Sequence, residues 1–237
     1  MTFADKSKIE LSLNTNTVGL RKFNPLSAET CRQSILTGAS WVSFKPLLDF
    51  CWRNGIPVVY WKGEPGQCFD GISTSIEGIP IIILGSGKNT AWTTFHLAHE
   101  VGHIMLGHTN NAQLNLDSKI EDTHTGTNKK EIAATEFGNT LLRGTQKLPH
   151  VKMDVLPTEL QKISIKYRVS PATILLSNSW RSKNEKDFKI LTSRLSKMRS
   201  VCDTKQVVNE LLQTKIGHDF DAVLSDWQHD FLDALLG

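Results

Sequence analysis

The sequence lacks closely spaced cysteines and long apolar runs. Its four cysteines form no Cys-x-x-Cys pair and are scattered over the chain at Cys31, Cys51, Cys68 and Cys202. This spacing indicates reduced thiols in a cytoplasmic protein rather than a disulfide framework or a cysteine zinc site. The strongest apolar run, residues 79–84, is far too short to span a bilayer, and residues 1–13 have no apolar segment of the kind found in signal peptides. We therefore expect a cytoplasmic protein with no membrane partner.

A strong charge of one sign is also missing. The formal net charge is +3, which is too small by itself to indicate a nucleic-acid partner. Apolar residues make up 39% of the 237 residues and charged residues 22%, which is typical of a globular protein with a sizeable core. The length predicts one large domain, or one domain with an appended segment.

The most informative segment is His99-Glu100-Val101-Gly102-His103. On a helix, residues four apart share one face, so His99 and His103 can place two imidazole nitrogens on one Zn²⁺ ion. Glu100 lies beside these ligands, where a carboxylate can take a proton from water that the metal activates. The pattern is typical of metal-assisted hydrolysis of a peptide bond.

The residues around this motif favour a buried helix over about residues 92–106. No proline or glycine occurs there before Gly102, and apolar side chains recur at helical spacing on the sides away from the histidines. The remaining polar strip carries His96, His99, Glu100 and His103. Burying such groups without partners costs on the order of a few kcal/mol, and a bound metal would satisfy them. The alternative is a helix whose histidines are hydrogen-bonded core residues.

A small sheet is expected before the metal helix. One helix is predicted just after Ser27, which can cap it, and a second over about residues 43–53, ending at Asn54-Gly55. Strands are predicted at residues 56–61, 68–73 and 79–84, with a turn at 76–78. Later helices are predicted at about residues 129–142, 158–167, 171–180, 185–198, 204–214 and 219–236. The fold class is therefore α+β, with a small β-sheet packed on the metal helix and a mainly helical carboxy-terminal region.

A catalytic zinc site usually needs a third protein ligand in addition to a water molecule. Glu131 is the best candidate, because it begins a helix after the polar segment 109–130. Small residues on its side of that helix would allow close approach to the metal helix: Ala134, Thr135 and Gly138. The alternative is that Glu131 is only a first-turn acid favoured by the helix dipole. Glu136 is expected to point away from Glu131.

Other polar residues compete for roles near the metal. His96 can be a fourth ligand, a hydrogen-bond donor to the ligands or a buried core residue, and we favour the last. His108 and His124 can orient a substrate or stabilise an oxyanion, although each is more typical of a surface histidine. Tyr60 and Tyr167 are further candidates for stabilising the oxyanion.

Three segments occur in an order that is known from one family of peptidases. The first contains residues 95–103 and continues with Leu106-Gly107-His108; the second is Glu131-Ile132-Ala133-Ala134-Thr135-Glu136-Phe137, followed by Leu141-Leu142. The third is Tyr167-Arg168-Val169-Ser170-Pro171-Ala172. These segments resemble the ImmA/IrrE-type metallo-endopeptidases, over about residues 40–180. The chain departs from the family where Thr135 replaces the usual Asn and Ala133 replaces a frequent acid, whereas Glu131 is retained.

The resemblance implies a cytoplasmic, zinc-dependent endopeptidase in which His99, His103 and Glu131 hold Zn²⁺ and Glu100 is the general base. It implies a zincin-like metallopeptidase domain, which we place at residues 1–150, followed by a helical carboxy-terminal region at 151–237. Such enzymes are often encoded with a DNA-binding repressor that they cleave, and many carry an amino-terminal helix-turn-helix domain. Only about 25 residues precede the first predicted helix, so we expect that domain to be absent and the repressor to be a separate chain.

Two other classes of function remain open. One is a non-proteolytic regulatory protein or toxin–antitoxin component with a structural metal, whose site a fourth ligand such as His96 would close. The other is direct nucleic-acid binding, because residues 162–199 contain ten Lys or Arg and two acids, a segment charge of +8. Aromatic residues suited to base stacking are sparse there, and residues 219–233 contain five acids without Lys or Arg. We therefore favour a solvated basic surface over a nucleic-acid site.

Overall fold

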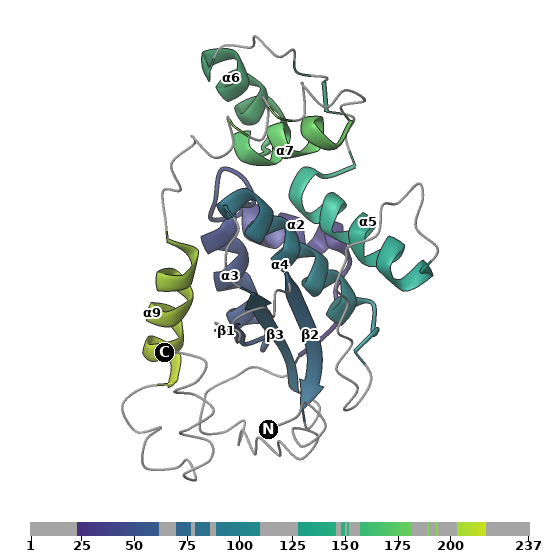
Figure 1. Cartoon of the computed structure of the whole chain (residues 1–237), viewed down its shortest axis with the longest axis vertical. Helices are drawn as coiled ribbons and strands as arrows, with labels where there is room; N and C mark the ends of the chain where they lie inside the picture. Colours follow the sequence, from purple (N-terminus) through teal and green to yellow (C-terminus); the bar gives the residue numbers. More distant parts are fainter. Residues whose placement is uncertain are drawn as a thin grey trace.

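The computed structural model of the chain describes residues 23–61, 70–76, 79–85, 89–109, 128–145, 148–149, 151, 157–181, 189, 193 and 203–216. These residues form seven helices and one three-stranded sheet (Figure 1). The mixed, mostly helical architecture confirms the predicted α+β class. No helix in this part of the chain combines the length and the apolar character needed to cross a membrane.

The first two described helices are α2 (Ala28–Leu36) and α3 (Phe44–Arg53). The side chain of Ser27 accepts a hydrogen bond from the first turn of α2, as its capping role predicts. The predicted end of α3 at Asn54-Gly55 is also confirmed, and Gly55 has a φ of 73°, which a residue without Cβ adopts easily. The chain then turns directly into the first strand.

The sheet contains β1 (Val58–Trp61), β2 (Gly71–Ile76) and β3 (Ile79–Gly85) in the order β1-β3-β2. The central strand β3 pairs in parallel with β1 and antiparallel with β2. The predicted boundaries of the second strand were wrong, because Asp70 precedes the strand and Ile76 belongs to it. Ile76 pairs with Ile79, so only residues 77 and 78 connect the strands, as in a two-residue hairpin.

Two long helices follow the sheet, α4 (Thr90–Met105) and α5 (Lys129–Arg143). The side chain of Asn89 caps α4 by accepting a hydrogen bond from the backbone N–H of Trp92. Every residue of α4 from Thr93 to Met105 is buried, which confirms the prediction of a helix enclosed on nearly all sides. Helix α4 packs against β2, β3 and α5, so it occupies the centre of the molecule (Figure 1).

The remaining helices are α6 (Pro157–Tyr167), α7 (Pro171–Arg181) and α9 (Thr204–Ile216). The hydroxyl of Ser170 accepts a hydrogen bond from the backbone N–H of Thr173 at the start of α7. Helix α7 packs on α4, and α9 packs on β1 and α3. Apolar side chains from both predicted segments, 1–150 and 151–237, share one hydrophobic core. The helices predicted at 185–198 and 219–236 fall almost entirely outside the described residues.

Two arginines join helix ends that are distant in the sequence. The buried guanidinium of Arg32 on α2 donates hydrogen bonds to the carbonyl oxygens of Leu141 and Leu142, at 3.1 and 2.8 Å, near the end of α5. Its other terminal nitrogen donates to the carbonyl oxygens of Tyr167 and Arg168, at 3.4 and 2.7 Å. Carbonyl groups at helix carboxyl ends have no partners within the helix, so a cation among them is stabilising. Arg168 likewise satisfies carbonyl groups at and after the end of α2, because its guanidinium donates hydrogen bonds to the carbonyl oxygens of Leu36, Ala39 and Ser40.

Replacing Arg32 with Met should lower the free energy of unfolding by about 3 kcal/mol, because several buried carbonyl groups lose a charged donor at once. The measurement is urea unfolding followed by circular dichroism in the presence of a chelator. Arg53→Met is the matched control, because Arg53 is exposed and its Nε bonds only a carbonyl of its own helix. An equal loss in the two variants would contradict the assigned role of Arg32.

Candidate metal centre

The face of α4 that carries the histidines meets the first turn of α5. The Nε2 atoms of His99 and His103 lie 3.0 Å apart, as expected for residues one helical turn apart. The Glu131 carboxylate, from the first turn of α5, places Oε2 3.1 Å from His99 Nε2 and Oε1 3.1 Å from His103 Nε2. The structure therefore brings the three predicted ligands together, in a buried cluster that we call the triad.

The donor set of the triad fits a divalent cation. A tetrahedral zinc ion with nitrogen and oxygen ligands at 2.0–2.1 Å would hold those atoms about 3.3 Å apart, only a few tenths of an ångström more than observed here. The three residues are almost fully buried: His99 is 1% exposed, His103 5% and Glu131 2%. Water therefore cannot solvate the cluster freely. Lone pairs that face one another at this distance need a proton or a cation among them. Within the described part of the chain, these three residues are the group that could hold a metal ion.

The triad depends on close approach between α4 and α5. A Cβ atom on Gly102 would lie 2.8 Å from the backbone oxygen of Ala134, and one on Gly138 would lie 3.2 Å from the backbone of Ala98 and His99. Glycine at both positions therefore lets the helices cross with their backbones in contact. Gly138 and Ala134 were expected to serve this purpose, whereas the role of Gly102 was missed.

Both histidines of the triad have a hydrogen-bond partner on the other ring nitrogen. His99 Nδ1 lies 3.2 Å from the Thr135 hydroxyl, and His103 Nδ1 lies 3.1 Å from His108 Nδ1. If both Nε2 atoms face a metal, His99 Nδ1–H donates to Thr135 and His103 Nδ1–H donates to His108. Such bonds fix the tautomer and the orientation of a metal-binding imidazole.

His108 has an intermediate exposure and lies beside His103. His108 is half-buried, because Gly107 has a φ of 69° and turns the chain back toward the end of α4. Burial lowers the pKa of His108, and the nearby His103 and Lys130 lower it further. The lowered pKa favours the neutral ring, which can accept a hydrogen bond at Nδ1. The glycine two residues after the end of α4 was the signal for this return.

Glu100 lies next to the triad on the side of the sheet. Its side chain packs against the backbone of Gly71 on β2, where a Cβ atom would lie 3.0 Å from Glu100 Cγ. Burial raises the pKa of Glu100, while the nearby His99 and His103 and a hydrogen bond with the Ser73 side chain partly oppose that rise. A carboxylate in this setting is a stronger proton acceptor than one in water.

The other candidates from the sequence lie elsewhere. His96 is buried with Nε2 3.5 Å from Asp70 Oδ2, which agrees with a paired core histidine rather than a member of the triad. The Tyr60 hydroxyl lies 2.9 Å from the Thr204 hydroxyl on α9, and the Tyr167 ring lies under the ammonium group of Lys166. Glu136 is exposed, as expected. His124 lies outside the described residues.

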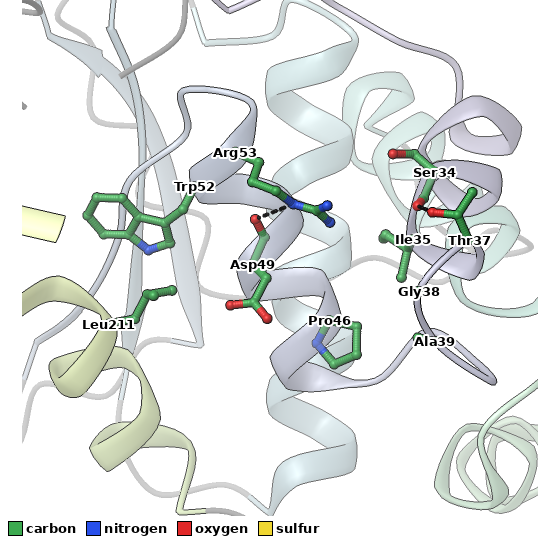
Figure 2. A pocket seen from close by; sticks show the side chains of 10 residues that line it. All are labelled: Ser34, Ile35, Thr37, Gly38, Ala39, Pro46, Asp49, Trp52, Arg53 and Leu211. Carbon is green, nitrogen blue, oxygen red and sulfur yellow. Dashed lines mark hydrogen bonds between the residues drawn. The ribbon is translucent and has the colours of Figure 1, made fainter. Parts of the chain in front are cut away.

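A cavity of about 410 Å³ lies between α2, α3 and α9 (Figure 2). Its lining includes Trp52, Asp49 and Arg53 from α3 and Leu211 from α9. None of the triad residues, nor Glu100, lines this cavity. It is therefore a separate feature of the surface and has no part in the metal centre.

No protein-family model matches the chain, and no curated protein matches it. The resemblance to ImmA/IrrE-type peptidases therefore stays a prediction.

We predict that the chain binds one zinc ion through the triad. Glu131→Gln should weaken zinc binding by more than the roughly tenfold to hundredfold typical of losing an outer hydrogen-bond partner, because it removes the charged ligand. Competition with a chromophoric chelator measures the affinity. Glu136→Gln on the same helix is the matched control and should bind zinc like the unchanged protein. Equal affinity in the two variants would show that Glu131 is not a ligand.

The outer partners of the histidines should also affect the affinity. Thr135→Val and His108→Ala should each weaken zinc binding by about tenfold to hundredfold, because the imidazoles lose the bonds that orient them. Thr140→Val, on the same helix as Thr135, is the control and should leave the affinity unchanged. The same competition assay measures all three variants, and unchanged affinity in Thr135→Val and His108→Ala would reject the assigned bonds.

Proposed function

We propose that the chain is a zinc-dependent endopeptidase. The observation that carries this proposal is the buried triad of His99, His103 and Glu131 with the Glu100 carboxylate beside it. Two imidazoles and one carboxylate leave a fourth position for water, which is typical of catalytic rather than structural zinc sites.

Each residue of the site has a distinct role in this proposal. The triad holds the ion, which when bound lowers the pKa of water and polarises the carbonyl group of the substrate. Glu100 accepts a proton as water attacks the scissile carbonyl carbon, and it delivers that proton to the amide nitrogen as the C–N bond breaks. The Ser73 side chain, which bonds Glu100, holds the carboxylate in place.

The position of the sheet supports a zincin-like arrangement. Strand β2 lies at an edge of the sheet, and its residues Gly71 and Ser73 contact Glu100. An extended peptide can add to such an edge through main-chain hydrogen bonds. A substrate bound there would have its backbone close to Glu100 and the triad.

The substrate class follows from the resemblance to ImmA/IrrE-type peptidases. We propose a cytoplasmic regulatory protein, in particular a DNA-binding repressor supplied as a separate chain. The third segment of the resemblance, residues 167–172, makes contacts that stabilise the fold. Arg168 donates hydrogen bonds to three carbonyl groups, Val169 forms an isolated β-bridge with Val42, and Ser170 caps α7. These contacts explain why a peptidase of this architecture would need that segment.

A second candidate is a non-proteolytic regulatory or toxin–antitoxin protein with a structural metal. Such a site needs a fourth protein ligand, and His96 was the candidate. The pairing of His96 with Asp70 makes this reading less favourable than the peptidase.

Direct nucleic-acid binding through the α6–α7 helix pair is also less favourable. Arg168 belongs to the basic stretch, but its guanidinium is bound to the carbonyl groups after α2. A cation used in this way is not available to a phosphate. A titration with salt against duplex DNA would reveal binding if affinity fell steeply as salt increased.

Glu100→Gln should retain zinc and lose about 10²–10⁴-fold in cleavage rate, because the amide cannot accept the proton. The substrates to test are the repressor-like proteins encoded beside this chain, incubated with the zinc-loaded protein and analysed by mass spectrometry. Discrete fragments should form without chelator and disappear with it. Glu136→Gln is the control for the substitution. Cleavage by Glu100→Gln at the rate of the unchanged protein would refute the assigned base.

A further inference from the structure

Trp180, near the end of α7, is a large apolar residue that remains partly exposed. It is 42% exposed, and among the described residues only Leu106 and Ile165 are comparable, at 43% and 63%. The Trp180 ring meets Phe95 edge-to-face, with centroids 4.5 Å apart, and meets Trp92 with centroids 5.3 Å apart. Helix α7 therefore holds an exposed indole over the first half of α4.

The rings under Trp180 continue the face of α4 that carries the triad. Trp92, His96, His99 and His103 follow one another at intervals of four, three and four residues. At about 100° per residue, their four directions fall within about 60° of the helix circumference. Trp92 stacks on His96 with centroids 6.0 Å apart, and Phe95 lies 6.4 Å from His99. The aromatic surface and the metal ligands thus share one side of one helix.

We infer that Trp180 and Trp92 form a specificity subsite for an aromatic or large aliphatic side chain of the peptide substrate. This inference rests on the proposed peptidase function. Covering a partly exposed indole with another apolar group removes apolar surface from water, and tryptophan is frequent among residues that dominate binding energy. Phe95 and Trp92 already contact one side of the ring, which limits the side-chain freedom that substrate binding would remove.

The spacing fixes where the preferred side chain lies in the substrate. Trp92 and His99 are separated by about 10 Å along the helix axis, from a rise of 1.5 Å per residue. An extended peptide advances about 3.3 Å per residue. For a peptide that extends parallel to α4, the side chain on Trp180 and Trp92 therefore belongs to a residue about three positions from the bond that is cleaved.

The first experiment compares cleavage of mixed unstructured peptides by the zinc-loaded full chain and three variants. Cleavage sites of the unchanged protein should be enriched in Trp, Phe, Tyr or Leu about three residues from the cut. Trp180→Ala should lose this enrichment and at least about fivefold in kcat/KM for a peptide with Phe at that position. The kcat/KM of Trp180→Ala should equal that of the unchanged protein for the same peptide with Ala in place of Phe. Trp180→Phe should restore the preference, and Ile165→Ala, which shortens an exposed apolar residue on α6, should leave it intact.

The second experiment measures binding without cleavage. Zinc-loaded Glu100→Gln should bind a fluorescent peptide with Phe more tightly than its Ala counterpart, and the added substitution Trp180→Ala should abolish the difference. Zinc content, determined on each variant, shows that the fold around the triad is retained. Three results would overturn the subsite. The first is cleavage or binding with no preference for the Phe peptide over the Ala peptide. The others are an equal preference in Trp180→Ala and a preference for Lys and Arg at that position. Failure of the unchanged protein to cleave any peptide, with the Phe preference still present in binding, would instead refute the peptidase and leave the subsite standing.

Discussion

The close contact between α4 and α5 is the constraint on which the candidate metal centre depends. Helices that pack through ordinary side chains lie about 8–10 Å apart. Here Gly102 and Gly138 let the two backbones touch, and the short side chain of Ala134 adds no obstacle. Glycine inside a helix costs about 1 kcal/mol relative to alanine, and the contacts along the crossing offset that loss. Because of this approach, a carboxylate in the first turn of α5 reaches two imidazoles on α4.

The same crossing creates an electrostatic problem that has a chemical solution. It buries two imidazoles and a carboxylate within hydrogen-bond distance of one another, and it buries Glu100 beside them. Thr135 and His108 are hydrogen-bonded to the Nδ1 atoms of the two imidazoles. The Nε2 atoms of the imidazoles are therefore the ones that face Glu131. A divalent cation held by the three residues would neutralise this arrangement. The polar strip of an otherwise apolar helix thus contains a group of residues that could hold a metal ion.

The features that depend on local patterns could be predicted from the sequence. The burial of α4, the capping residues Ser27 and Ser170, and the stop at Asn54-Gly55 follow from periodicity and capping chemistry. Glu131 could be proposed because small residues on its side of the helix signal a close neighbour. The hydrogen bonds of Arg32 could not be predicted, because their carbonyl acceptors lie more than a hundred residues away in the sequence. The pairing of His108 with His103 was missed because it needs the positive φ of Gly107, and the start of β2 because its register is fixed by a hairpin with β3.

Helix α9 has a consequence for how the sheet can meet another molecule. It packs alongside β1, where the Tyr60 and Thr204 hydroxyls are bonded, so that side of the sheet already has a neighbour from the same chain (Figure 1). The opposite border of the sheet is formed by β2, which packs on α4 and whose residues Ile72, Ser73 and Thr74 are buried. Open strand edges favour unwanted self-association, so the cover that α9 gives β1 protects that flank of the sheet.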